Sequence, residues 1–567
     1  MNPKKTLPID LSPDYIANRQ IQQSGKDSQS LNYESNPPIG IDLGTSNSVI
    51  AKWVNTIRMT GSSVYKFNDQ DSFLMPSVVH YDKDDDDEKA QFIVGKLAKV
   101  KQVMSPETVV THVKRKISDD SKCIQLGNDH FSPSEISAEI IKAMFKSLIS
   151  TGLNCPEGIV VSVPYYFTQL QNNHTRLAIE KAIQETPQFT NTHFLGLIPE
   201  PVAATLSYAM DHANETREQI ILTFDLGGGT LDVTILRLDI TGSSIDFEVL
   251  AVDGDDKFGG LDFDYLIESY IIDHESISFD GLHHRQEKIY RNKIREAAQD
   301  AKEQLSISKK HDIYIADIHE PTSLRIKRSQ FEKMLCGKNF LNRNFSDELI
   351  QILERVEQKA KMAAKNIDLI LPVGGSAKIP FFQKLLMSRY SNAMFQTINE
   401  DGTDPMFQSV AKGASIYAAY LLDSHKGYKL LPKDIDIRII QRTCHHLGIR
   451  TRQHNFNVIM PENSIVPDAR DKFFYPVGYR DADKKMAYTS VIEVYQGKSA
   501  DIYENTLIGK INLPDIYTHG RPLKDIRIQI TFDVDSTVLK VNIVIPQSTA
   551  NKTDIDITEH IQLEKRT

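Results

Sequence analysis

Hydrophobic residues follow two different patterns along the chain. In the first three quarters, short apolar runs such as 220–224 alternate with longer stretches of helical spacing such as 136–149. Near the end, segments such as 525–535 alternate strictly between apolar and polar residues. The first pattern predicts an α/β domain that extends to about residue 425. The second predicts half-exposed antiparallel strands, and therefore a mostly β domain over residues 444–567.

Local signals place several individual elements. Ser132 and Glu135 have the spacing of a capping box, and the apolar face that follows predicts a helix over 136–149. Strong helix formers predict a second helix over 291–305. Strands are predicted at 158–163, 220–224, 233–236, 491–495 and 538–545.

Three consecutive glycines, Gly227, Gly228 and Gly229, separate the apolar runs 220–224 and 233–236. Glycine costs backbone entropy on folding, so three in a row need a reason. A strand-turn-strand with bare N–H groups at its tip can surround an anion. Asp225 and Asp232 stand beside this turn, where a hard cation can lie. The stretch thus suggests nucleotide and metal binding, and a glycine-rich hairpin without a ligand is the alternative.

A second copy of the pattern lies upstream in residues 39–53. A strand again delivers an aspartate, Asp42, followed by Leu43, Gly44 and Thr45 and then by a second apolar strand. The two copies are about 180 residues apart, which predicts two related lobes facing each other across a phosphate. No G-x-x-x-x-G-K-[ST] loop occurs in the chain, so this is not a Walker site.

With the two hairpins, further segments resemble the Hsp70 branch of the actin, sugar kinase and Hsp70 group of ATPases. Residues 158–167 resemble V-V-T-V-P-A-Y-F, residues 198–204 resemble I-N-E-P-T-A-A, and residues 258–264 resemble L-G-G-E-D-F-D. The glycine-rich segment 371–380 and the β segments 447–449, 494–498, 507–510 and 528–535 also have counterparts there. The resemblance covers roughly residues 38–560.

This resemblance implies a fold and a domain order. We expect a disordered extension over 1–36, an actin-like, two-lobed nucleotide-binding ATPase domain of the α/β class over 37–425, and an interdomain linker over 426–443. A mainly β substrate-binding sandwich domain then covers 444–567. The family's long helical lid has no counterpart in the sequence, so we expect a divergent member without it.

The resemblance also implies ATP or ADP with Mg²⁺ as cofactors and assigns residues to them. The catalytic residues are expected to be Lys114, Thr230, Glu200 and Asp225, and the metal residues Asp42, Asp225 and Glu200, acting through the waters of Mg²⁺. The nucleotide-binding residues are expected to be Gly44, Thr45, Ser46, Asn47, Gly227, Gly228, Gly229, Thr230, Gly259, Gly260, Lys302, Ser306, Gly374, Gly375, Ser376 and Lys378. For Lys114, a solvated helix lysine is the alternative.

Two departures lie in the nucleotide site. The family has arginine where Lys378 stands and glutamate where Gln299 stands. A lysine cannot stack a planar group on adenine as a guanidinium does. These changes predict somewhat weaker nucleotide affinity.

Other departures lie in the segments that couple the domains. The family linker D-V-L-L-L-D-V is replaced by Asp436–Arg442, with Arg438 inside its apolar run and Gln441 in place of its second aspartate. Gly196 and Asn172 stand where bacterial members have arginines. We therefore expect a weak or altered response to J-domain proteins. In the peptide groove, Arg452 and the charged loop 474–487 predict fast peptide release or a different ligand.

Composition adds limits. The 567 residues carry a net charge of −9, which gives no reason to expect nucleic acid or an anionic membrane as a partner. Four separated cysteines favour free thiols in a reducing compartment, and no apolar run is long enough to span a membrane. The first residues lack the apolar stretch of a secretory signal, so a cytoplasmic location is expected.

Three further features are interpreted as having no ligand. The acidic run 82–89 is expected to be a solvated loop rather than a calcium site. Cys444-His445-His446 lacks further metal ligands at a suitable spacing. Trp53, the only tryptophan, is expected to serve packing.

The function expected from the resemblance is that of an Hsp70-like molecular chaperone. It would hydrolyse ATP slowly and bind extended segments of unfolded or client polypeptides, with a J-domain protein and a nucleotide-exchange factor as possible partners. The alternative is a divergent regulator that binds nucleotide but modulates other chaperones. A sugar kinase fits the hairpins alone, but the C-terminal β domain argues against it.

Overall fold

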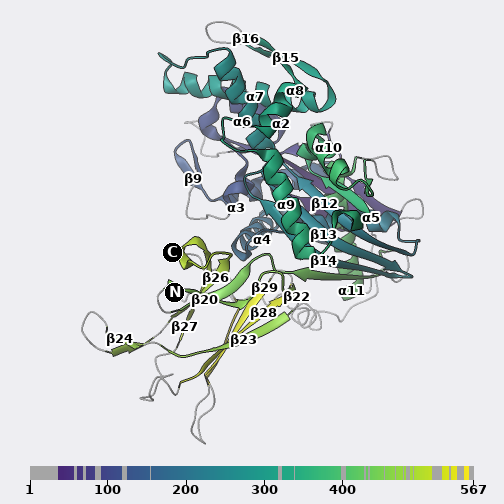
Figure 1. Ribbon diagram of the computed structural model, residues 1–567, viewed down its shortest axis with the longest axis vertical. Helices are drawn as coiled ribbons and strands as arrows, with labels where there is room; N and C mark the ends of the chain where they lie inside the picture. The colour runs from purple at the N-terminus through teal and green to yellow at the C-terminus, as the bar shows by residue number, and fades with distance from the viewer. Residues whose placement is uncertain are drawn as a thin grey trace, which may run out of the picture.

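The computed structural model describes residues 36–560 with internal gaps. The gaps are at 56–59, 68–71, 84–90, 118–123, 154, 317–321, 338, 398–403, 427–428, 432–434, 452–453, 467, 477, 481–485, 489–490, 514–525, 536–537 and 546–554. The predictions for the extension 1–35, for most of the acidic run 82–89, for Arg452 and for much of the loop 474–487 therefore lie outside the described residues. The described chain forms a two-lobed α/β part followed by a β sandwich (Figure 1), which confirms the predicted fold class.

The first lobe is built on a six-stranded sheet in the order β11-β10-β1-β2-β3, with β4 on β2. These strands are β1 (Ile39–Asp42), β2 (Asn47–Asn55), β3 (Thr60–Val64), β4 (Met75–Pro76), β10 (Gly158–Val163) and β11 (His193–Pro199). Helices α3 (Pro133–Ser150) and α4 (Gln169–Gln184) pack with this sheet in one apolar core. The predicted capping box is present at the start of α3, where the Glu135 N–H donates to Ser132 Oγ at 3.2 Å and the Ser132 N–H donates to Glu135 Oε2 at 3.0 Å.

The second lobe is built on a seven-stranded sheet in the order β18-β17-β12-β13-β14-β19-β22. Its strands are β12 (Arg217–Leu226), β13 (Leu231–Thr241), β14 (Ser244–Asp255), β17 (Leu369–Val373), β18 (Met394–Phe395), β19 (Asp436–Arg442) and β22 (Ile465–Val466). The family linker segment thus forms β19, which pairs parallel to β14. Its helices are α6 (Gly260–His274), α7 (His284–Ile307), α8 (Arg328–Cys336), α9 (Phe345–Ala360) and α10 (Pro380–Arg389).

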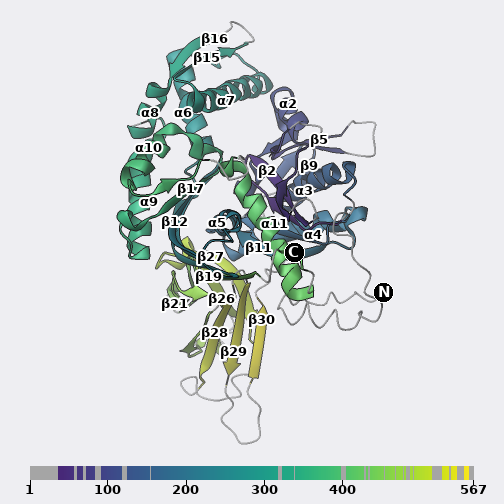
Figure 2. The ribbon, with the colours of Figure 1, turned by 90° about the vertical axis from the view of Figure 1, so that its right-hand side faces the viewer.

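Helices α5 (Glu200–Asp211) and α11 (Pro405–Lys426) lie between the two sheets (Figure 2). Close packing there requires glycine. A Cβ on Gly413 of α11 would lie 1.7 Å from Ala203 O of α5, and one on Gly40 of β1 would lie 2.2 Å from Ser415 N of α11. The two helices therefore join both lobes through backbone contact.

Smaller elements extend each lobe beyond its sheet. On the first lobe these are β5 (Val78–Asp82), β6 (Gln91–Val94), α2 (Lys96–Met104), β7 (Val109–Thr111), a 3₁₀ turn (Val113–Lys116), β8 (Ile124–Leu126) and β9 (Asp129–Phe131). On the second, β15 (Lys310–Ile315) pairs with β16 (Thr322–Lys327). Helix α2 meets α7 across the gap between the lobes, where Lys99 Nζ donates to Gln299 Oε1 at 3.3 Å.

Trp53 lies on β2 and is almost fully buried. Its indole Nε1–H donates to the carbonyl oxygen of Leu430 at 2.9 Å, six residues before β19 begins. The prediction that Trp53 serves packing agrees with this burial, and the hydrogen bond also ties the segment after α11 to the first lobe.

The C-terminal part is a sandwich of two four-stranded sheets. One has the order β21-β20-β26-β27 and the other the order β23-β28-β29-β30. The strands are β20 (His446–Arg450), β21 (Phe456–Met460), β23 (Asp468–Phe474), β26 (Val491–Gly497), β27 (Thr506–Asn512), β28 (Ile528–Asp535), β29 (Val538–Ile545) and β30 (Ile555–His560). The predicted alternation is observed over the described residues 528–534, because Ile528, Ile530, Phe532 and Val534 all enter one core. No helix among the described residues is long and apolar enough to cross a membrane.

Candidate functional site

The two predicted hairpins face each other between the lobes. The turn after β1 carries Thr45 and Ser46, and the turn after β12 carries Gly228 and Gly229. A Cβ on Gly228 would lie 2.1 Å from Ser46 Oγ, and a Cβ on Gly229 would lie 3.1 Å from Thr45 Oγ1. The glycines are needed here because the two turns approach each other so closely. The sequence prediction of two facing turns is consistent with this geometry.

Four carboxyl groups gather at the base of the turns, around one ammonium group. Asp225 and Asp232 are directly opposite each other on β12 and β13, Asp42 ends β1, and Glu200 begins α5. Lys114 Nζ lies 2.6 Å from Glu200 Oε1, and both side chains are about nine-tenths buried. The prediction that Lys114 faces the site, rather than solvent, agrees with this burial.

Burial controls the ionisation of this cluster. Desolvation, together with the charge of Glu200, raises the pKa of Asp42 to about 7 and that of Asp232 to about 8. The same two causes raise the pKa of Asp225 well above its usual range. Burial alone would lower the pKa of Lys114, but the charges of Glu200 and Asp42 outweigh it and raise that pKa. The lysine therefore stays charged among acids that resist ionisation.

The donor set fits a hydrated divalent cation. Four carboxyl groups with one lysine carry excess negative charge when ionised. A cation of charge +2 would favour the ionised form of Asp42, Asp225 and Asp232 and so oppose the desolvation that raises their pKa values. Among the residues that the structure describes, no three His, Cys, Asp or Glu side chains are placed to ligate one metal ion directly.

Arg115 was not among the predicted site residues. Its guanidinium donates to the carbonyl oxygen of Gly229 and pairs with Asp262 at 3.2 Å. Asp262 in turn accepts from the N–H of Gly259 at 2.9 Å. Arg115 thus joins the 3₁₀ turn of the first lobe to the glycine turn of the second. Its place beside Lys114 in the sequence was the signal that could have identified it as a site residue.

Lys302 and Gly260 form the next part of the site. Lys302 Nζ pairs with Asp264 at 2.8 Å and donates to Gly260 O at 3.1 Å. A Cβ on Gly260 would lie 2.7 Å from Ser376 Oγ, so these predicted residues converge. Ser306 Oγ donates to Lys302 O at 3.1 Å, one helical turn away on α7. Asp264, which was not predicted as a site residue, belongs to the segment 258–264 that carries the family resemblance.

The last part of the site follows β17. Gly374 has φ = 83°, and a Cβ on it would lie 2.5 Å from Leu226 O, so glycine is required on both counts. Lys378 pairs with Asp404, and its ammonium lies 4.3 Å from the centre of the Phe407 ring. Lys378, which stands where the family has arginine, is therefore held by Asp404 just before α11 and by the ring of Phe407 in α11.

Cys444, His445 and His446 make ordinary hydrogen bonds. Cys444 Sγ donates to Tyr165 O at 3.0 Å, His445 Nε2 donates to Tyr166 O at 3.2 Å, and His446 Nδ1 accepts from the Glu462 N–H at 2.8 Å. These contacts agree with the interpretation that the three residues are not a metal site.

Comparisons with known proteins agree with these features. The family described as "Hsp70 protein" matches residues 38–126 and 118–567. Over 505 residues the chain is 30% identical to the "Chaperone protein DnaK" of Thermotoga neapolitana, which covers 88% of this chain and 76% of the relative. The "Chaperone protein DnaK" of Thermosipho africanus gives the same identity and the same two coverages.

Proposed function

Because this chain belongs to the Hsp70 family, we propose that it is a chaperone that binds Mg·ATP between its lobes and hydrolyses it slowly. Its β sandwich binds extended segments of unfolded or client polypeptides. Its place of action is the cytoplasm. Its partners include a nucleotide-exchange factor and J-domain proteins, and its response to J-domain proteins is weak or altered.

The observation that supports this proposal best is the buried Lys114–Glu200 pair among the carboxyl groups of Asp42 and Asp225. Phosphoryl transfer depends on positioning and on charge stabilisation rather than on a covalent step of the protein. Asp42, Asp225 and Glu200 would hold the hydrated Mg²⁺, which would supply positive charge to the phosphates. Lys114 places a second positive charge where negative charge develops, and Glu200 orients water.

The remaining predicted residues bind the nucleotide. The N–H groups of the turns at 44–47 and 227–230 would surround the phosphates. Gly259 and Gly260 allow the backbone to approach, and Lys302, Ser306, Gly374, Gly375, Ser376 and Lys378 line the site for ribose and adenine. Because Lys302 and Lys378 are already paired with acids, we expect them to contribute hydrogen bonds rather than free charge.

Single-turnover hydrolysis of Mg·ATP, with and without an unfolded peptide, tests the proposal. We compare the wild type with Thr230→Val, which removes only the hydroxyl group beside the glycine turn. The matched control is Thr241→Val at the exposed far end of β13. We expect hydrolysis that the peptide accelerates, a fall of at least about tenfold in Thr230→Val, and no change in Thr241→Val. No hydrolysis in the wild type, or equal rates in all three proteins, would refute it.

The alternative is a regulator that keeps the nucleotide site but whose ATP hydrolysis is not accelerated by peptide. One observation favours it. Gln441 and Asn172, which replace charged family residues, line the same small cavity between the domains. Hydrolysis that is indifferent to peptide, together with a stable complex with another chaperone, would establish this function instead.

A further inference from the structure

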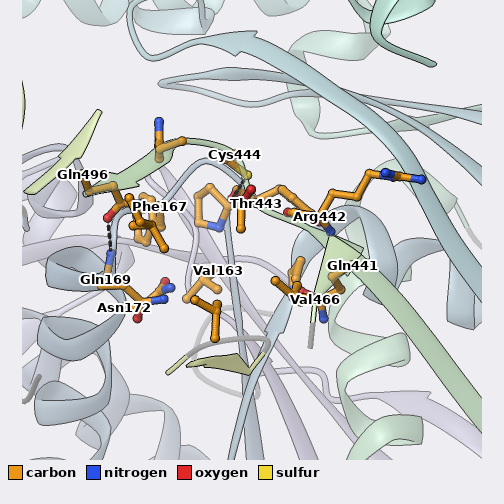
Figure 3. A pocket seen from close by; sticks show the side chains of 16 residues that line it. Val163, Phe167, Gln169, Asn172, Gln441, Arg442, Thr443, Cys444, Val466 and Gln496 are labelled. Carbon is orange, nitrogen blue, oxygen red and sulfur yellow. Dashed lines mark hydrogen bonds between the residues drawn. The ribbon is translucent and has the colours of Figure 1, made fainter. Parts of the chain in front are cut away.

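The linker strand and the β sandwich meet the first lobe at the loop that follows β10. Figure 3 shows this junction, where residues 163–172 lie against residues 441–447 and Gln496. The Gln169 N–H donates to Gln496 Oε1 at 3.1 Å, directly from lobe to sandwich. The cavity between them measures about 60 Å³, which is enough for roughly four water molecules and too small for a peptide.

Tyr165 binds both main-chain groups of one linker residue. Its hydroxyl donates to Arg442 O at 2.9 Å and accepts from the Arg442 N–H, also at 2.9 Å. A hydroxyl has one hydrogen and two acceptor sites, so it can make both bonds at once. Tyr165 is only 7% exposed, and these bonds therefore satisfy backbone groups that water reaches poorly.

The side chain of Arg442 binds two other parts of the molecule. Nε donates to Val249 O at 2.8 Å, and Nη2 pairs with Glu248 at 3.3 Å, both on β14 of the second lobe. Nη1 donates to Asn463 O of the β sandwich at 3.2 Å. Figure 3 shows this side chain reaching away from the cavity. One residue is thus bonded to the first lobe, the second lobe and the sandwich.

Both members of this contact depart from the family pattern. Tyr165 stands at the alanine of V-P-A-Y-F, and Arg442 stands at the last valine of D-V-L-L-L-D-V. An alanine at 165 has no hydroxyl to bind the main chain of residue 442. A valine at 442 keeps that main chain but lacks the guanidinium that binds Val249, Glu248 and Asn463. Two substitutions that are 277 residues apart in the sequence therefore add bonds to the same linker residue, one set to its main chain and one from its side chain.

The nucleotide site lies a short distance along the same strand. Ser162, at the end of β10, donates its hydroxyl to Asp42 Oδ1 at 3.1 Å. Tyr165 follows three residues later. A displacement of β10 that accompanies a change at Asp42 would therefore move the Tyr165 hydroxyl and, with it, the backbone of Arg442.

We propose that Tyr165 and Arg442 are a pair of positioning residues that hold the sandwich against both lobes at once. When the lobes separate, Tyr165 on the first lobe and β14 on the second pull Arg442 in opposite directions. This weakens the contact of the sandwich with both lobes. The role in coupling rests on the proposed ATP-driven function, whereas the docking role does not.

Amide hydrogen exchange of residues 436–449 tests the docking role directly. The variants are Tyr165→Phe, which loses only the hydroxyl, Arg442→Val, which restores the family residue, and the double variant. Arg438→Val is the matched control, because Arg438 lies on the same strand and pairs with Asp246 at 3.0 Å but is 66% exposed. We expect each single variant to exchange about tenfold faster, since buried backbone groups lose their partners.

Two independent tenfold effects would multiply to a hundredfold. The double variant should exchange far less than a hundredfold faster, because both single changes release the same residue, Arg442, from its neighbours. Arg438→Val should change exchange less than about threefold. Unchanged exchange in Tyr165→Phe, an equal effect of Arg438→Val, or fully multiplicative single effects would overturn the proposal.

A second measurement addresses coupling. In Tyr165→Phe, we expect single-turnover hydrolysis of Mg·ATP to keep its basal rate but to lose most of its acceleration by peptide. Acceleration equal to that of the wild type would overturn the coupling role. If the wild type itself does not hydrolyse ATP, the proposed function fails, and the exchange comparison still decides whether Tyr165 and Arg442 hold the domains together.

Discussion

Replacing Lys114 with methionine removes a cation that is buried beside four carboxyl groups. Lys114 and Glu200 are 2.6 Å apart and nearly buried, and removing one partner of such a pair costs about 3–5 kcal/mol. Protonation of the remaining acids can offset this cost at low pH. We therefore expect Lys114→Met to lower the free energy of unfolding by about 1–2 kcal/mol at pH 6 and by about 3–5 kcal/mol at pH 8.5.

The sign follows from proton binding. Without the lysine, the pKa values of Asp42 and its neighbours rise further, so the folded variant holds protons that the unfolded chain has released. Each such carboxyl costs about 1.4 kcal/mol per pH unit until the pH exceeds its folded pKa. In the wild type this cost stops accumulating for Asp42 near pH 7, whereas in the variant it continues. The difference between the two proteins must therefore grow as the pH rises.

Urea unfolding without nucleotide, followed by circular dichroism at both pH values, measures this difference. Lys116→Met is the control, because Lys116 is exposed on the same 3₁₀ turn and should change stability by less than about 0.5 kcal/mol. In parallel, hydrolysis of bound Mg·ATP should fall about 10²–10³-fold in Lys114→Met. A loss of stability that is the same at both pH values, or hydrolysis at the wild-type rate, would refute this account of the cluster.

Two further predictions concern the same region. In EDTA, the free energy of unfolding of the wild type should fall as the pH rises from about 5 to 8. The pKa values of Asp42 and Asp232 are raised from 3.8 to about 7 and about 8, so over this range the folded state holds protons that the unfolded state has lost. Urea titrations at pH 5.5, 7 and 8.5 measure this slope, which Asp232→Asn should reduce, and a stability that rises over this range would contradict it. Gly259→Ala should destabilise the protein by about 1–3 kcal/mol, because its Cβ would lie 2.6 Å from the backbone of Gly229, whereas Gly227→Ala, with its nearest contact at 4.0 Å, should cost less. Thermal unfolding compares the two, and equal shifts would count against the close approach of the turns.

Much of this structure could be predicted from the sequence because its signals are local. The alternation of apolar residues in 525–535 and the capping box at Ser132 each fix an element without reference to distant parts of the chain. The facing turns followed from two similar hairpins, and Lys114 from a short motif. Each hairpin is itself a short local pattern, and their pairing was inferred from the similarity of two such patterns far apart in the sequence.

Contacts between distant segments could not be predicted in this way. Arg438 was interpreted as an interruption of an apolar linker, and Arg442 was given no role. The structure pairs them with Asp246 and Glu248 of β14. The place of Arg115 beside Lys114 suggests that it lies near the site, but not that it contacts Gly229, 114 residues away in the sequence. Such pairs depend on strand register and on how the lobes close, which no short stretch of sequence specifies.

The hydrogen bond from Trp53 to Leu430 has a spectroscopic consequence. Since the chain contains one tryptophan, its intrinsic emission comes from a single, shielded indole whose N–H is bonded to the segment that leads into β19. Release of that segment would expose the ring to water and shift its emission to longer wavelength. The protein therefore carries its own optical reporter of linker detachment, and no dye has to be attached to follow it.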